Sequence, residues 1–336
     1  MKKTVISLFA ICASVFAGAQ MMPDSTVQIV AYWSKGDKIS YDCASSQYVI
    51  DADGNKKVDY ATSETRTFEV IDADDSSYTV RLSYSDVFSP APVNYLTESQ
   101  VKELGEAFVI TFKTNELGSF TGFVDDDESF NTYSGMVDTI IENAWKENRK
   151  DLKGVSKEQF AESIKAPLCN KEYLYASMLA DFNPLLMFHG CRLDTTTVYS
   201  FPQDFKTIYN SDKPLQLETQ FWVDEKLTDT TAVVIRTDAY AGNDILGPMV
   251  RDYTIKMAKS TLDMTGTPYT DAEIIEEVDK MMEENAMSTS LEEYTTIQVH
   301  LDTGWPICWY STREVLSSNN QTEAKIVIEK SAELQM

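Results

Sequence analysis

The sequence YVIDADGNKKVDY, residues 48–60, decides how the chain begins to fold. An Asp-Gly step separates its two apolar runs, which is typical of a β-hairpin because glycine accepts the positive φ angle that such a turn needs. Alternating Asp and Asn side chains also resemble a calcium loop. An EF-hand loop that starts at Asp51 needs glycine at its sixth position and glutamate at its twelfth, but Gly54 is fourth and Thr62 is twelfth. We therefore predict a hairpin tip and no metal site.

The segments around this hairpin alternate between apolar and polar side chains. Tyr78, Val80, Leu82 and Tyr84 fall on one face of an expected strand, with polar residues between them. Alternation with a period of two is typical of strands that bury one face. Short polar turns join such strands into antiparallel hairpins. Residues 27–86 are therefore predicted to form a meander of strands.

Helical patterns dominate the next part of the chain. A short helix is expected over 97–108 and a strand pair over 108–124, and from residue 129 to residue 190 apolar side chains recur at spacings of three and four. Pro184 should kink or end its helix. Three capping boxes mark expected helix starts: Thr97 with Gln100, Ser156 with Gln159, and Thr270 with Glu273.

The rest of the chain repeats this order of elements. Strands are expected over 215–225 and 229–240, helices over 245–264 and 271–287, and three strands over 295–304, 305–316 and 323–330. Strands and helices in separate runs indicate an α+β fold, not βαβ alternation. We predict a mainly antiparallel, curved sheet with helices packed on one face. The predicted halves are 20–190 and 191–336, which a duplication would relate and which can share one continuous sheet.

The first residues predict where the protein is located. MKKTVISLFAICASVFAGAQ has a basic start, a short apolar run and small residues before the cleavage point, so residues 1–19 are predicted to be a signal peptide. We expect export to the periplasm, the cell surface or the medium, with no transmembrane segment, because no later stretch is apolar enough to span a bilayer. The formal net charge of −24 repels phosphate backbones, so a nucleic-acid partner is not expected.

Four cysteines follow the signal segment, and an exported protein meets an oxidising compartment. Cys169 and Cys191 bracket a helical segment, which makes them the favoured disulfide pair. Cys43 and Cys308 would then join an early strand to a late one. Four buried free thiols are the alternative.

Common catalytic motifs are weak or incomplete in this sequence. Asp302-Thr303-Gly304 matches the core of an aspartic protease, but that chemistry needs two such aspartates, so a turn between strands is predicted. His189 and Cys191 could form a thiol dyad, although a helix-end histidine and a disulfide cysteine are favoured. Two histidines in the whole chain argue against zinc. We predict no catalytic residue, no cofactor and no metal.

Flexible thioethers and tryptophans are the candidates for ligand contact. Thioethers suit an adaptable apolar cavity, although ordinary packing of helices on a sheet explains the same residues. The candidate ligand-binding residues are Met249, Met257, Met281, Met282, Trp305 and Trp309.

Two stretches carry a family resemblance. TNELGSFTGF (114–123) and LDTGWPICWYSTREV (301–315) resemble secreted or periplasmic proteins of Bacteroidetes-type bacteria. The expected layout is similar to that of the LolA-like lipoprotein carriers, in which a curved antiparallel sheet holds helices on its concave face. The resemblance implies no catalytic residue.

We therefore expect a non-catalytic envelope protein that binds a lipid, another apolar ligand or an envelope protein on a helix-covered sheet. A deep apolar cavity would support the ligand version, and a solid, close-packed core at that place would exclude it. The first alternative is a cell-surface structural or interaction module, which predicts an exposed apolar patch. The second is a glycan-active hydrolase, which needs two carboxylates roughly 5 to 9 Å apart in an aromatic cleft.

Overall fold

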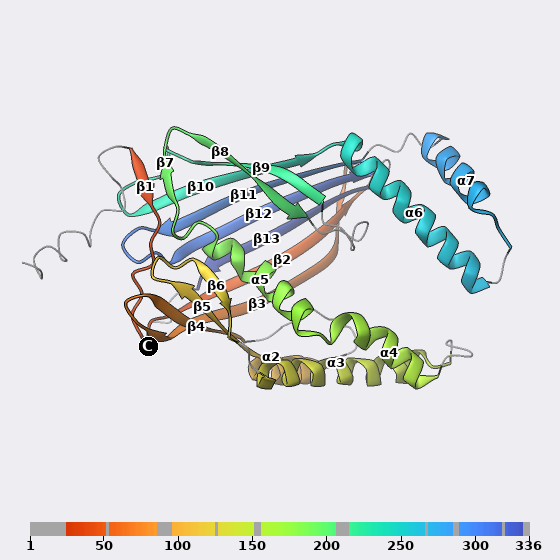
Figure 1. The fold of residues 1–336 in the computed structure, drawn as a ribbon, viewed down its shortest axis with the longest axis horizontal. Helices are drawn as coiled ribbons and strands as arrows, with labels where there is room; N and C mark the ends of the chain where they lie inside the picture. Colours follow the sequence, from red (N-terminus) through yellow and green to blue (C-terminus); the bar gives the residue numbers. More distant parts are fainter. Residues whose placement is uncertain are drawn as a thin grey trace, which may run out of the picture.

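A computed structural model describes residues 25–51, 54–85, 96–124, 127–150, 156–205, 215–265, 268–284, 289–317 and 320–331. Its main element is an antiparallel sheet of eleven strands in the order β6-β5-β4-β3-β2-β13-β12-β11-β10-β9-β8 (Figure 1). Helices pack on this open sheet, so the predicted α+β class is confirmed. The expected signal peptide, residues 1–19, lies outside the described residues.

The order of the strands follows from a single path of the chain. β2 enters at the centre of the sheet and hairpins lead outward to β3 and β4, after which the chain passes through a helix and adds β5 and the edge strand β6. The chain then crosses to the other edge, β8, and returns strand by strand until β13 pairs with β2. The strands are β2 (Lys38–Ile50), β3 (Lys56–Ala73), β4 (Ser77–Tyr84), β5 (Val109–Asn115), β6 (Phe120–Phe123), β8 (Val198–Phe205), β9 (Leu215–Val223), β10 (Ala232–Ala241), β11 (Thr289–His300), β12 (Pro306–Ser317) and β13 (Asn320–Lys330). The two predicted halves thus share one continuous sheet, and their origin by duplication stays a prediction.

The hairpin predicted from residues 48–60 is confirmed. Ile50 at the end of β2 pairs with Lys56 at the start of β3. The Asp51 N–H donates to the Asn55 carbonyl at 3.1 Å, and the Asp51 carboxylate accepts the Asn55 N–H at 2.9 Å. Asp51 therefore closes the turn with its own side chain.

Two strand predictions needed correction. The predicted meander starts at residue 27, but at this end only Thr26–Gln28 is a strand, β1. It pairs with β7 (Arg192–Asp194) in a separate two-stranded sheet. The following N–H groups donate to carbonyls of three different loops, so no strand can continue. β8 was not expected, and it contains Pro202. Proline is tolerated there because β8 is an edge strand.

Six helices lie within the described residues, at or near the predicted positions. They are α2 (Glu98–Ala107), α3 (Asp127–Asn148), α4 (Lys157–Leu168), α5 (Lys171–Leu186), α6 (Asn243–Thr265) and α7 (Asp271–Glu284). The three predicted capping boxes are present at the starts of α2, α4 and α7. None of these helices combines the length and the apolar character that crossing a membrane requires.

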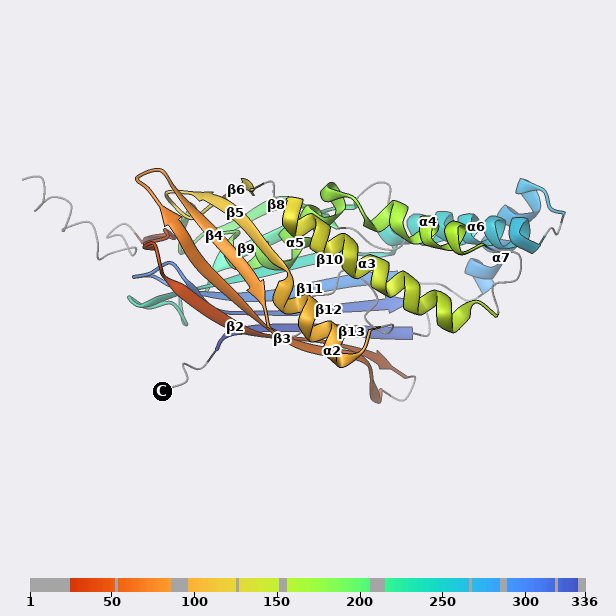
Figure 2. The same cartoon turned by 90° about the horizontal axis from the view of Figure 1, so that it is seen from below.

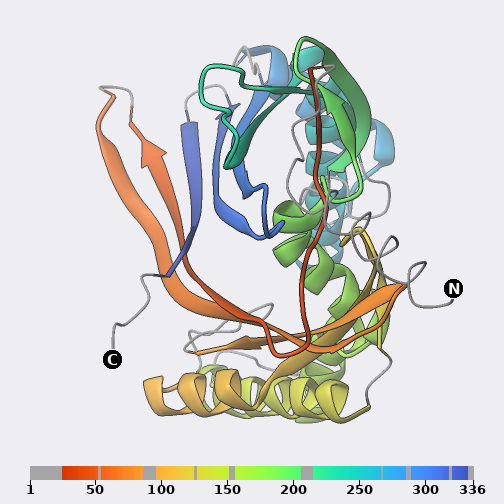
Figure 3. The same ribbon diagram turned by 90° about the vertical axis from the view of Figure 1, so that its left-hand side faces the viewer.

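The sheet is strongly curved, and α5 lies inside the curve (Figure 3). α2 contacts β4, α3 contacts α2 and α4, and α4 contacts α5. α3 and α4 extend beyond the ends of the short strands β4–β6, and α6 and α7 project beyond the sheet at the same end, where α6 contacts β10 and β11 (Figures 1 and 2). The concave side thus holds α5 between two groups of helices.

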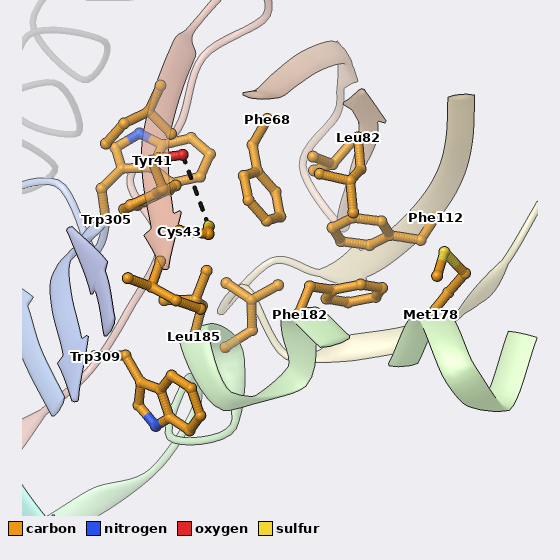
Figure 4. Close-up of a cluster of buried hydrophobic side chains, with 14 of the residues drawn as sticks. Tyr41, Cys43, Phe68, Leu82, Phe112, Met178, Phe182, Leu185, Trp305 and Trp309 are labelled. Carbon is orange, nitrogen blue, oxygen red and sulfur yellow. Dashed lines mark hydrogen bonds between the residues drawn. The ribbon is translucent and has the colours of Figure 1, made fainter. Parts of the chain in front are cut away.

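The main hydrophobic core lies between α5 and the concave face. α5 is apolar on almost all sides, as expected for a helix buried in a core. Phe182 stacks on Phe112 with ring centroids 4.5 Å apart, and Phe68 meets both rings edge to face (Figure 4). Pro184 lies inside α5, two residues before the helix ends.

The four described cysteines are free, so both predicted disulfides are wrong. Cys169 caps the end of α4, and α5 then separates it from Cys191. A helix of this length spans about 24 Å, whereas disulfide-bonded Cα atoms lie within about 7 Å. Cys43 and Cys308 lie on strands separated by β13, at a spacing of about 10 Å. Cys308 also points away from the face that Cys43 shares with Trp309.

Candidate functional site

One row of the concave face is apolar across five adjacent strands. Register places these residues side by side from β10 to β2: Ile235, Ile297, Trp309, Ile328 and Cys43. All five are buried. Because side chains alternate along each strand, the row belongs to one face and forms a continuous apolar wall.

The next two rows contain polar side chains on β10, β11 and β12. Thr237, Thr295 and Ser311 lie side by side and are nearly inaccessible to solvent. The Thr295 hydroxyl donates to Ser311 Oγ at 3.4 Å. In the row after that, Arg313 forms an ion pair with Glu293 across the β11–β12 ladder. On β11 and β12 the concave face therefore changes from apolar to hydroxyl-bearing to charged over four residues. On β13 the same rows stay apolar, with Ile326 beside Ser311 and Ala324 beside Arg313.

α5 covers the apolar part of this face. Its Leu185 side chain lies above Trp309, and Phe182 and Met178 follow along the helix towards β5 (Figure 4). α5 contacts β12 on one side and β6 on the other. The helix thus occupies the surface that an apolar ligand would otherwise use.

A buried charged cluster fixes α5 to the sheet. Arg66 on β3 approaches Glu64 Oε1 at 2.5 Å and Asp181 Oδ1 of α5 at 2.7 Å. Arg66 Nη1 also donates to the Asp181 carbonyl at 2.9 Å, and the Tyr84 hydroxyl donates to Asp181 Oδ2 at 3.0 Å. One guanidinium therefore serves two carboxylates and a carbonyl at the interface of helix and sheet.

Burial controls the protonation of this cluster. Desolvation raises the pKa of Glu64 to about 7, although the Arg66 guanidinium opposes the shift. Desolvation likewise raises the pKa of Asp181, again against Arg66. The Cys43 thiol beside them has its pKa raised to about 12, chiefly by burial, so it is protonated and unreactive at neutral pH.

Under α5 the core is close-packed. The void beneath it measures about 140 Å³ and is too narrow for a water molecule. Its lining residues are Tyr41, Phe68, Leu185, Leu186, Trp305 and Pro306. The deep apolar cavity expected for a ligand carrier is thus not present at this place, and the close packing argues against an apolar ligand held here while α5 is docked. An apolar ligand could reach this wall only if α5 moved.

The six candidate ligand-binding residues do not meet at one place. Trp305 and Trp309 belong to the main core, and Met249 packs at the base of α6 against a small second cluster. Met257 on α6 and Met281 on α7 are exposed, at 47% and 36% of their surface. Met282 is half-buried on α7. Only Trp309 of these six lies in the apolar row.

His189 and Cys191 lie in a structural junction, not in an open site. His189 Nε2 is 2.7 Å from the Gly304 carbonyl, and Nδ1 is 3.2 Å from the Leu186 carbonyl. Burial lowers the pKa of His189 to about 4 and raises that of Cys191. Gly304 belongs to the tight turn predicted from Asp302-Thr303-Gly304, with φ of +72°. A Cβ there would lie 2.2 Å from the Val30 carbonyl oxygen, so the turn requires glycine.

A second, polar cleft lies where β13 ends beside β2. It has a volume of about 700 Å³ and contains Asp37, Asp42 and Trp305 among its lining residues. The Asp42 carboxylate accepts hydrogen bonds from the hydroxyls of Thr65 and Ser331. Trp305 stacks on the buried Trp33 at 4.2 Å and is only 9% exposed, which leaves little ring surface for a sugar. This cleft lacks the aromatic platform that the hydrolase alternative requires.

Comparison with known proteins identifies no family. No family model matches the chain, and no curated protein matches it. A structure titled "Lipid-protein interactions in lipovitellin" aligns over 89% of this chain and 25% of its own, at 8% identity and a TM-score of 0.34. A structure of Ail, the attachment invasion locus protein of Yersinia pestis, aligns over 88% of this chain and 98% of its own, at 3% identity and a TM-score of 0.16. The chain thus spans about a quarter of the lipovitellin chain, and at these scores neither structure informs its function.

Glu64, Arg66 and Asp181 were not among the residues singled out from the sequence. A signal was nonetheless present, because Glu64 and Arg66 are in phase with the apolar residues Phe68 and Val70 on the same strand. Charged residues on the face that a strand buries need partners. Their partner on α5 could not be found from sequence, since Asp181 lies 115 positions from Arg66.

Proposed function

We propose that this protein is a non-catalytic binding protein for a long-chain apolar or amphipathic molecule, such as a lipid, on the concave face of its sheet. The observation that carries the proposal is the graded face itself. An apolar wall across five strands is followed by hydroxyls on three of them, β10 to β12, and then by the Glu293–Arg313 ion pair on β11 and β12. Such a gradient suits a molecule with an apolar chain and a polar end.

The energetics favour a chain of moderate length. Burial of each CH₂ group contributes about 0.8 kcal/mol, so a chain of about twelve carbons gains roughly 10 kcal/mol before the costs of association. The hydroxyls of Thr237, Thr295 and Ser311 would offer hydrogen bonds to the polar end of the molecule, including a carboxylate.

In this proposal α5 is the resident occupant of the apolar wall. The helix presents Phe182, Leu185 and Leu186 to the sheet much as a ligand would present methylene groups. Binding therefore exchanges one apolar surface for another, and α5 shifts when the ligand enters. The proposal also keeps the expected exported location, so the ligand would be a molecule of the cell envelope.

The test is the binding of dansyl-undecanoic acid, a fluorescent amphiphile, followed by its fluorescence increase. The wild-type protein should bind it saturably. Trp309→Leu, which removes the central ring of the apolar row, should weaken binding about tenfold or more. Tyr310→Leu is the matched control because the neighbouring side chain points outward, is 39% exposed and bonds Glu329, so binding should not change.

Two results would contradict the proposal. One is the absence of saturable binding by the folded wild-type protein. The other is equal weakening by both variants, which would place the probe elsewhere. Circular dichroism of each variant ensures that the comparison is made between folded proteins.

A further inference from the structure

α5 is held in the concave face by apolar contacts and by a single internal charge. Its charged residues are Lys171 and Glu172 in the first turn and Asp181 near the middle. Lys171 bonds to Asp127 at the start of α3, away from the sheet. Asp181 is therefore the charged group through which the body of α5 meets the strands.

The cluster around Asp181 holds more negative than positive charge. Glu64 and Asp181 both approach Arg66, and their side chains are 15% and 25% exposed. Within the described chain, Arg66 is the one cation that meets either carboxylate. When both carboxylates are ionised, the buried cluster carries a net negative charge that water screens poorly.

The other groups that face the cluster do not supply the missing positive charge. β2 contributes the Cys43 thiol, and β4 contributes the Tyr84 hydroxyl, which already donates to Asp181. Tyr41 on β2 donates to the Pro306 carbonyl instead. A proton bound to one of the two carboxylates is therefore the simplest way to balance Arg66, and the raised pKa of Glu64, about 7, agrees with this.

We propose that Glu64, Arg66 and Asp181 form a proton-linked latch that fixes α5 over the apolar wall and loosens when the cluster loses its proton. The latch rests on the proposed function for its purpose, since it would control access to the same face. Two features transmit its release. Phe182 directly follows Asp181 and stacks on Phe112, and Pro184 deprives the next turn of one backbone hydrogen bond.

The direction in which pH changes the docking of α5 follows from the raised pKa of Glu64 in the docked state. Docked α5 holds the proton more tightly than undocked α5, in which Glu64 faces water. Raising the pH through the range between the two pKa values therefore favours undocking. With values of about 4.5 and about 7, the opening equilibrium should rise about tenfold between pH 6 and pH 8.

The test is hydrogen exchange of α5 peptides without any ligand, from pH 6 to pH 8, corrected for the intrinsic exchange rate at each pH. Protection in the wild-type protein should fall about tenfold. In Glu64→Gln, which keeps the shape of the side chain but cannot ionise, it should change less than twofold. Glu69→Gln removes an exposed carboxylate from the opposite face of the same strand and should behave as wild type.

A second readout uses thiols. Cys43 lies beneath α5, so its labelling relative to Cys308 should rise with pH in the wild type and not in Glu64→Gln. Identical pH profiles in wild type and Glu64→Gln, by either readout, would overturn the latch. Binding of dansyl-undecanoic acid is measured separately: a latch without binding contradicts only the proposed function, and binding without pH-dependent opening contradicts only the latch.

Discussion

The side chains on the concave face differ between the two halves of the sheet. On the side of β2–β6, inward aromatic residues pack against α5 and fill the space. On β10–β12, the inward rows end in hydroxyls and an ion pair, and α6 with α7 projects beyond the sheet (Figure 2). The difference lies in the helices, because α5 is mostly apolar and has three charged residues, whereas α7 has one apolar stripe and seven acidic residues. α5 is therefore part of the main hydrophobic core, whereas α6 and α7 lie outside it.

The largest effect is expected where α5 and the sheet share their most buried ring. Phe182→Ala should destabilise the protein by about 3–5 kcal/mol, because it removes a fully buried ring that stacks on Phe112. Met257→Ala on the projecting side should cost less than about 0.5 kcal/mol, since its side chain is largely exposed. Urea unfolding measures both. Equal losses of unfolding free energy in the two variants would contradict the difference in packing between α5 and the projecting helices.

The charged cluster should give the next largest change. Arg66→Met leaves two buried carboxylates without a cation and should cost about 3–5 kcal/mol at pH 8. Adding Glu64→Gln and Asp181→Asn to this variant should restore most of the loss, because no unpaired charge then remains. If the triple variant is no more stable than Arg66→Met, the loss comes from packing and not from charge.

The cluster also sets a pH dependence. Because the folded-state pKa of Glu64 is raised to about 7, the folded protein binds this proton more tightly than the unfolded chain. The contribution of this proton to the free energy of unfolding is fully present below about pH 4.5 and is lost as pH rises through about 7. The total contribution is about 3 kcal/mol. The stability difference between wild type and Glu64→Gln, measured from pH 4.5 to pH 8, should show this slope. A flat difference would contradict it.

A smaller and local effect is expected on the projecting side. Arg251 on α6 pairs with Asp279 on α7 through two hydrogen bonds at 2.5 and 2.9 Å. Asp279→Asn should cost no more than about 1 kcal/mol, because the pair is partly exposed. Hydrogen exchange should quicken in α7 while α5 is unchanged. Faster exchange in α5 would mean that the two sides are coupled.

The smallest effect concerns the cysteines. Since Cys43, Cys169, Cys191 and Cys308 are free, adding reductant should leave the melting temperature unchanged. Thiol titration in denaturant should find all four reactive. A higher melting temperature in the absence of reductant would show that a disulfide forms after all.

Local patterns in the sequence predicted much of the fold. Alternation at Tyr78–Tyr84 and the Asp-Gly turn at Gly54 specify strands and hairpins through neighbouring residues alone. Capping boxes at Ser156 and Thr270 specify helix starts in the same way. By contrast, residues 29–33 depend on three distant loops, so their departure from a strand could not be seen locally.

The site was less predictable, for a physical reason. Trp309 was identified as a candidate, but its apolar row arises only from register across five strands that are far apart in the sequence. The methionines were predicted to bind a ligand because of their thioether chemistry. The sequence does not show that α6 and α7, which carry them, project beyond the sheet. The sequence does not distinguish Asp181 from the other acidic residues, and only the packing of α5 on the sheet brings it to Arg66.

The central claim is that α5 and an amphipathic ligand compete for one apolar wall. The most direct measurement is hydrogen exchange of α5 at pH 7 with and without saturating dansyl-undecanoic acid. We predict that α5 loses protection when the probe binds, while α3 keeps its own. Bound probe with unchanged or increased protection of α5 would contradict the claim.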